Sequence, residues 1–285
     1  MPGETTIQIG LKHLKDQIEK KRNFYIPKIN KEYAYSNFIM LNYYRNPINF
    51  IFFNESVIVC SLFSFDLKDA WENGVPIDQL FERACFLAEL IKREEVLKER
   101  ITPETRDIFD GNLRTMMDQR LVTIKEDSQG VTRVVLKSSG EAQTLLIGSI
   151  CWPMIDTYYV VLVFALSMAK NKNVEESKFA KDVQWLAETL FIEKKIQYFE
   201  SCNQPAITNA KTAMLSEGIF KKKDVYVNLA PEYLKSDGEK RLVAVIDRVG
   251  QYRSKPTTQS LLEDFSPEED LRRTIFSEFP MMAKL

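Results

Sequence analysis

The chain has 285 residues, of which 45% are hydrophobic and 28% charged, and its formal net charge is −1. This composition is that of a globular protein with one large or two modest cores. A net charge so close to zero supplies no overall field that would attract nucleic acid, so we expect no nucleic-acid partner.

The cysteines and the N-terminus limit the classes further. The four cysteines lie far apart, which argues against a disulfide scaffold or a zinc site and predicts free, reduced, mostly buried thiols: Cys60, Cys85, Cys151 and Cys202. The first twenty residues contain no apolar segment of the kind found in secretory signals. A helical pattern begins almost at Met1, which we interpret as a fragment, a short isoform or a truncated gene model.

The N-terminal part of the chain predicts helices. Residues 5–8 have the form of a capping box, and an apolar stripe follows them at helical spacing: Ile7, Leu11, Leu14 and Ile18. Pro27 and Asn30 indicate a loop. Residues 33–65 are predicted to be helical, with an interruption near Pro47.

Two apolar blocks contain one charge each. Pro47–Phe65, which follows the polar segment Tyr43–Asn46, contains Glu55, and residues 142–169 contain Asp156 and Pro153. A spanning helix needs ~20 mostly apolar residues, and a lone carboxylate is costly in lipid. We therefore expect buried core helices, in which Arg45 or a backbone donor meets the carboxylate. Helices lying in a membrane interface remain a second option.

The remaining elements follow in chain order from turn, cap and spacing signals. We expect a turn at 73–76, a helix carrying Leu80 to Ile91, a helix starting at Thr102-Pro103-Glu104, and a hairpin of 121–125 with 132–137. A long helix at 174–200, a helix from Pro205 to a left-handed cap at Gly218, and a strand at 225–229 should follow the second apolar block. The last expected elements are a helix around 242–250, a polar linker at 251–265, and a short helix starting at Ser266 and ending at Pro280.

The predicted fold class is mainly α with a few short β-strands and hairpins, an α-rich α+β fold. A helix followed by an extended segment occurs at 104–137 and at 205–229, which resembles two winged-helix-like units, although two ordinary α+β units are the simpler interpretation. We expect one helical domain over residues 1–253, subdivided near residue 140, and a polar linker with a short helix over 254–285.

No catalytic residue, metal ligand or cofactor site is predicted. The one histidine, His13, lies among lysines on a predicted helix and matches no catalytic triad or metal-binding pattern. The ten glycines are scattered, so they form no phosphate-binding loop. The basic cluster Lys221–Lys223 is expected at a solvated hairpin tip rather than at a nucleic-acid site.

Several segments, in order, resemble the C-terminal region of glycerol-3-phosphate and dihydroxyacetone-phosphate acyltransferases. They are Leu41–Asn46, the run Glu55–Leu62 in the first apolar block, Trp152-Pro153 leading to Tyr158, and Met214–Phe220. The resemblance covers about residues 5–253. Its specificity comes from the order of these segments, because no single one is decisive.

The resemblance implies glycerolipid synthesis, in which acyl-CoA donates an acyl chain to the sn-1 hydroxyl of glycerol 3-phosphate. It also implies that the family's catalytic histidine, followed five residues later by an aspartate, is absent, since Ile18 stands five residues after His13. We therefore expect a non-catalytic domain, inactive alone, that packs on a catalytic domain and a membrane surface. Arg45 and Asn46 are the candidate interdomain contacts.

The branch of the family stays open. The run Glu55–Leu62 is most similar to the animal mitochondrial enzymes, which implies the mitochondrial outer membrane. The last residues, Ala283-Lys284-Leu285, resemble a peroxisomal targeting tripeptide, so the dihydroxyacetone-phosphate branch of ether lipid synthesis is an alternative. A free-standing helical scaffold or adaptor is the alternative from another class of protein.

Overall fold

The computed structural model describes residues 18–21, 24–27, 51–66, 68–94, 99–170 and 173–254. The chain divides into two compact units, Asn49–Thr258 and Met1–Ile48 with Gln259–Leu285. In the latter unit, the described residues form an antiparallel pair of strands, β1 (Ile18–Lys21) and β2 (Phe24–Pro27). Every other described element belongs to Asn49–Thr258.

The first predicted helix is wrong at Ile18, which lies in a strand. Its backbone begins strand β1 and lies opposite Pro27, whereas the other members of the predicted stripe lie outside the described residues. Strand β2 contains Phe24, Tyr25 and Ile26, aromatic and β-branched types that favour strands. Pairing with this strand outweighs the helical spacing that Ile18 shares with Leu14.

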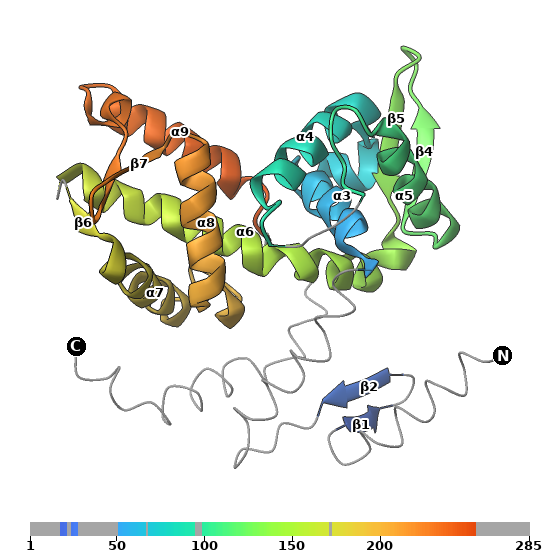
Figure 1. The fold of residues 1–285 in the computed structure, drawn as a ribbon. Helices are drawn as coiled ribbons and strands as arrows, with labels where there is room; N and C mark the ends of the chain where they lie inside the picture. Colours follow the sequence, from blue (N-terminus) through green and yellow to red (C-terminus); the bar gives the residue numbers. More distant parts are fainter. Residues whose placement is uncertain are drawn as a thin grey trace. The chain divides into compact units, whose positions relative to one another are not determined.

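The large unit contains the same order of elements twice: a helix, a short strand, two helices and a hairpin (Figure 1). The first copy comprises α3 (Phe53–Phe63), β3 (Val75–Pro76), α4 (Ile77–Leu90), α5 (Arg106–Asp118), β4 (Val122–Glu126) and β5 (Thr132–Leu136). The second comprises α6 (Glu141–Lys170), β6 (Val174–Glu175), α7 (Glu176–Ile192), α8 (Gln204–Ser216), β7 (Phe220–Lys223) and β8 (Tyr226–Leu229), and α9 (Gly238–Gly250) follows it.

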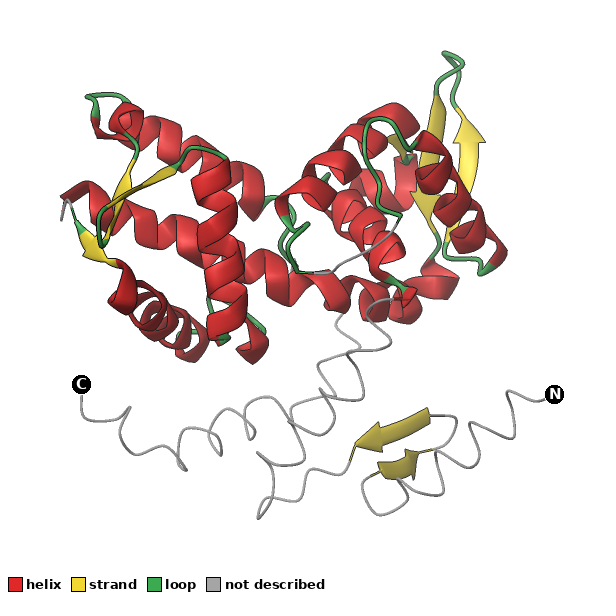
Figure 2. Cartoon of the chain, viewed as in Figure 1, coloured by secondary structure: helices red, strands yellow, loops and turns green. Residues whose placement is uncertain are grey.

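Each copy closes a small antiparallel sheet in the same way. The strand orders are β3-β5-β4 and β6-β8-β7, so the last strand of each hairpin lies in the centre and pairs with the short first strand. Helices dominate around both sheets (Figure 2). The α-rich α+β prediction is confirmed, and the repeated order fits the winged-helix interpretation more closely than two unrelated α+β units.

Two predicted turns are confirmed by left-handed glycines. The hairpin β4–β5 turns through Gly130, with φ of 74°, and helix α8 is followed by Gly218, with φ of 72°. Beyond Gly218, the amide of Ile219 donates to the carbonyl of Met214 at 2.9 Å, which closes the helix end in the manner predicted for a glycine cap.

The two apolar blocks form the helices at the centre of the unit. Ten of the eleven residues of α3 are buried, and α3 packs against α6. Helix α6 is long and apolar enough to cross a membrane by length and composition. However, 67% of the 18-residue stretch that meets this criterion is buried inside the protein. Both helices therefore have the burial expected of core helices.

Two predicted helix boundaries and the position of the basic cluster differ from the structure. Helix α5 begins at Arg106 rather than at Pro103, and α7 ends at Ile192 rather than near residue 200. The second difference has a local cause, because Lys194 takes a left-handed φ of 58° without a glycine to signal it. The basic cluster Lys221–Lys223 is exposed, as expected, but it lies on strand β7 before the turn.

Candidate functional site

The predicted contact residues Arg45 and Asn46 lie outside the described residues, as does His13. Within the described ranges, no group of three or more histidine, cysteine, aspartate or glutamate side chains could hold a metal ion. Several polar, charged and aromatic contacts from different helices meet at the end of helix α9, which we take as the candidate site.

The end of α9 contacts both copies of the repeated fold. Leu242, Ile246 and Val249 bury one face of α9, which packs against α6. Arg248, in α9, and Tyr252, two residues beyond its end, both reach α4. The Tyr252 hydroxyl donates to the carbonyl of Arg83 in α4 at 3.4 Å.

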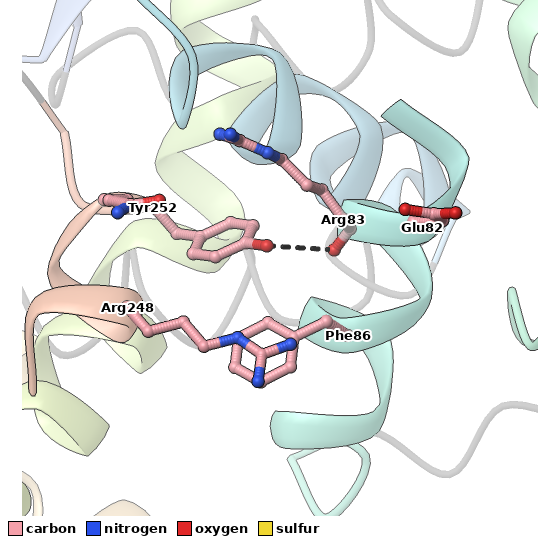
Figure 3. A pocket seen from close by; sticks show the side chains of 6 residues that line it. Glu82, Arg83, Phe86, Arg248 and Tyr252 are labelled. Atoms are coloured by element: carbon pink, nitrogen blue, oxygen red, sulfur yellow. Dashed lines mark hydrogen bonds between the residues drawn. The ribbon is translucent and has the colours of Figure 1, made fainter. Parts of the chain in front are cut away.

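Aromatic stacking adds to this contact. The ring of Tyr252 lies 5.5 Å from that of Phe86, and the Arg248 guanidinium lies 3.7 Å from the centre of the Phe86 ring (Figure 3). In α4, the Arg83 guanidinium lies 3.6 Å from the ring of Phe65. Stacking of this kind contributes about 0.5–2 kcal/mol according to how far the cation is desolvated.

Arg253 follows Tyr252 and reaches into the core. Its Nε donates to Oδ1 of Asp156 at 2.5 Å, and its Nη2 donates to the carbonyl of Lys195 at 2.6 Å. Asp156 is 1% exposed, and its Oδ2 also lies 3.5 Å from the amide nitrogen of Gln197. Burial raises the pKa of the Asp156 carboxyl, and the charge of Arg253 opposes that rise.

The ion pair with Arg253 shows how the Asp156 carboxylate, the one charge of the second apolar block, is neutralised. The partners suggested by the sequence were Arg45 or a backbone donor. Arg45 lies outside the described residues, and Asp156 is met by Arg253 together with the Gln197 amide. Arg253 and Tyr252 fall in the segment interpreted as a polar linker, so that interpretation is wrong at its start: Tyr252 is only 3% exposed.

A depression of about 260 Å³ opens between α4 and α9 (Figure 3). It is lined by Glu82, Arg83, Phe86, Arg248, Gln251 and Tyr252. Burial raises the pKa of the Tyr252 hydroxyl to about 12 against the opposing effect of both arginine charges, so the hydroxyl is a proton donor at neutral pH. The lining can bind and orient a ligand through guanidinium, amide and hydroxyl groups.

The thiols of the described residues are poor nucleophiles. Cys60, Cys151 and Cys202 are buried, and Cys85 is half-buried. Burial raises the pKa of Cys60, of Cys202 and, to a lesser extent, of Cys85. Because the thiolate is the reactive form, these cysteines suit packing rather than covalent chemistry.

We expect one cysteine to react first with iodoacetamide in the native protein at pH 7.5. Cys85 is the more accessible thiol, whereas the reagent reaches the other three only when the core opens. Mass spectrometry of peptides over a time course measures this order, and a sample labelled in urea, where all four react, is the control. Equal native rates for Cys60 and Cys85 would contradict the burial described.

Comparison with known protein families identifies the region to which this chain is similar. The model of the glycerol-3-phosphate acyltransferase C-terminal region matches residues 1–223, which is well over half of the chain. The match confirms the resemblance carried by the segments between Leu41 and Phe220. A comparison with curated proteins finds no match.

Proposed function

Since the chain belongs to the glycerol-3-phosphate acyltransferase family through its C-terminal region, we propose that it is a non-catalytic domain that packs on and stabilises a catalytic domain. The family match, in a chain whose one histidine lacks an aspartate five residues later, carries this proposal. The buried Asp156 supports it, because this carboxylate is paired with Arg253 and serves packing between helices.

The proposal assigns the acyl transfer to the partner. There, an acyl group would pass from acyl-CoA to the sn-1 hydroxyl of glycerol 3-phosphate, and this chain would contribute the surface that holds the partner in place. Large apolar side chains remain exposed on the described part of the chain, among them Ile51, Leu146 and Trp185.

The proposed location is a membrane surface, reached together with the catalytic domain. The mitochondrial outer membrane is favoured by the run Glu55–Leu62, and the tail Ala283-Lys284-Leu285 makes the peroxisome, with dihydroxyacetone phosphate as acceptor, the alternative. Imaging the chain with and without these three residues separates the two, because a receptor-read signal at the end of the chain is lost on its removal.

Co-expression with the catalytic half of a glycerol-3-phosphate acyltransferase tests the proposal. We expect a complex on affinity purification, and about tenfold weaker binding for Arg45→Ala or Asn46→Ala, since central polar contacts of an interface cost more than 1 kcal/mol each when truncated. The matched control is Arg241→Ala, which removes an arginine whose ion pair with Asp237 is local to α9.

The same preparation tests the assignment of catalysis. The purified chain alone should transfer no acyl group to glycerol 3-phosphate, whereas the catalytic half should retain activity longer in its presence. Failure to form any complex, with a stable soluble monomer, would instead favour the free-standing scaffold. The free-standing scaffold is supported by one observation: the unit Asn49–Thr258 has a complete core of its own.

A further inference from the structure

The depression between α4 and α9 is lined by two arginines, Arg83 and Arg248, that form no ion pair with a described carboxylate. No hydrogen bond or ion pair joins the Arg248 guanidinium to a described residue, and its contact there is the Phe86 ring. Arg83 uses Nη1 to donate to the carbonyl and hydroxyl oxygens of Ser64, at 2.7 and 2.8 Å. The structure therefore holds both guanidiniums in place through aromatic rings and neutral oxygens, without pairing either with a described carboxylate.

Apart from Glu82, the other groups of the lining are donors or neutral. The Tyr252 hydroxyl makes only a long bond of 3.4 Å to the Arg83 carbonyl, so it can turn to donate to a ligand. Gln251 adds an amide next to it. Glu82, the one acid of the lining, leaves a local charge of +1 when set against the two arginines.

We propose that this depression binds a phosphate monoester group, held by the Arg248 guanidinium and the Tyr252 hydroxyl. The guanidinium presents planar, paired donors that match two phosphate oxygens, and stacking on Phe86 fixes its plane. A phosphate monoester carries between one and two negative charges at neutral pH, which suits a lining with an excess of positive charge better than a singly charged carboxylate does. The site is independent of the proposed docking on a catalytic domain.

Titration of the full chain with inorganic phosphate, followed by amide NMR, tests this site at constant ionic strength. We expect saturable shifts confined to the ends of α4 and α9. Arg248→Gln should weaken binding about tenfold or more, because a hydrogen bond to a charged group is lost, and Tyr252→Phe should weaken it a few-fold. Glu82→Gln should strengthen binding, about twofold, since it removes the opposing charge.

The matched control is Arg241→Gln, on the same helix but paired with Asp237 and outside the depression, which should bind phosphate as the natural chain does. Vesicles containing phosphatidic acid, whose headgroup is a phosphate monoester, identify the source of the group. If they shift the same amides, the ligand is a lipid headgroup, and if only free phosphate does, it is a soluble ester. Shifts that never saturate, or an equal loss in Arg248→Gln and Arg241→Gln, would overturn the proposal.

Discussion

Arg253→Ala should lower the free energy of unfolding by about 3–5 kcal/mol at pH 7, one of the two largest effects that we expect from a single change in this chain. The variant leaves the Asp156 carboxylate, 1% exposed, without the cation that lies 2.5 Å from it. It also removes the donor to the Lys195 carbonyl. Urea unfolding followed by circular dichroism measures the loss.

Two comparisons separate the buried pair from a general loss of charge. Arg241→Ala breaks an exposed ion pair with Asp237 on the same helix and should lower the free energy of unfolding by only a small fraction of the loss expected for Arg253→Ala. Adding Asp156→Asn to Arg253→Ala should restore part of the lost stability, because the stranded charge disappears. A loss in Arg253→Ala no larger than in Arg241→Ala would show that the buried pair contributes nothing.

The pH dependence of this loss has a definite sign. Burial raises the pKa of Asp156 in the folded chain above its unfolded value near 3.9, and removal of Arg253 raises it further. A carboxyl with a raised folded pKa gives up stability as the pH rises from the unfolded pKa through the folded one. The difference between Arg253→Ala and the natural chain should therefore be smaller near pH 4 and grow towards pH 7.

The sequence correctly predicted the ends of those elements whose turn or cap is formed by a residue within the same short segment. The cap at Gly218 and the hairpin through Gly130 are right because a left-handed backbone favours glycine, which marks such positions in the sequence. Helix α7 was predicted too long because Lys194 adopts the same backbone region without that mark. Ile18 was misassigned because its strand depends on the pairing with β2.

The candidate site depended on contacts that no local pattern contains. Arg253 and Asp156 are 97 residues apart, and Tyr252 meets Arg83 across 169 residues. The sequence did indicate that Asp156 needs a partner, since a carboxylate inside an apolar block requires one. It could not choose the partner, because that choice follows from how α9 packs on α6.

Gly74→Ala should destabilise the chain by about 2–6 kcal/mol, for two separate reasons. Gly74 has φ of 77° and ψ of 157°, a backbone region that is essentially restricted to glycine and costs other residues about 1–3 kcal/mol. A Cβ there would also lie 2.6 Å from Cγ2 of Val135 and 3.1 Å from Cβ of Arg133, and overpacking of this kind costs about 1–3 kcal/mol.

The position explains why neither strain can relax easily. Gly74 precedes β3, whose Val75 pairs with Val134 in the central strand β5, and the carbonyl of Gly74 accepts a bond of 3.0 Å from Nη1 of Arg133. Moving the backbone away from Val135 would break the pairing that closes the first sheet. The clash is therefore expected to weaken the whole first copy of the fold.

Substitutions at two other glycines, measured by the same unfolding experiment, separate the cost of backbone strain from the cost of the steric clash. Gly218→Ala keeps the left-handed strain, but its Cβ would meet nothing within 4 Å, so it should cost only about 1–2 kcal/mol. Gly111→Ala, inside α5 with open space around its Cβ, should stabilise the chain by about 0.5–1 kcal/mol. If Gly74→Ala costs no more than Gly218→Ala, the contact with Val135 is not a constraint, and β3 must be free to shift against β5.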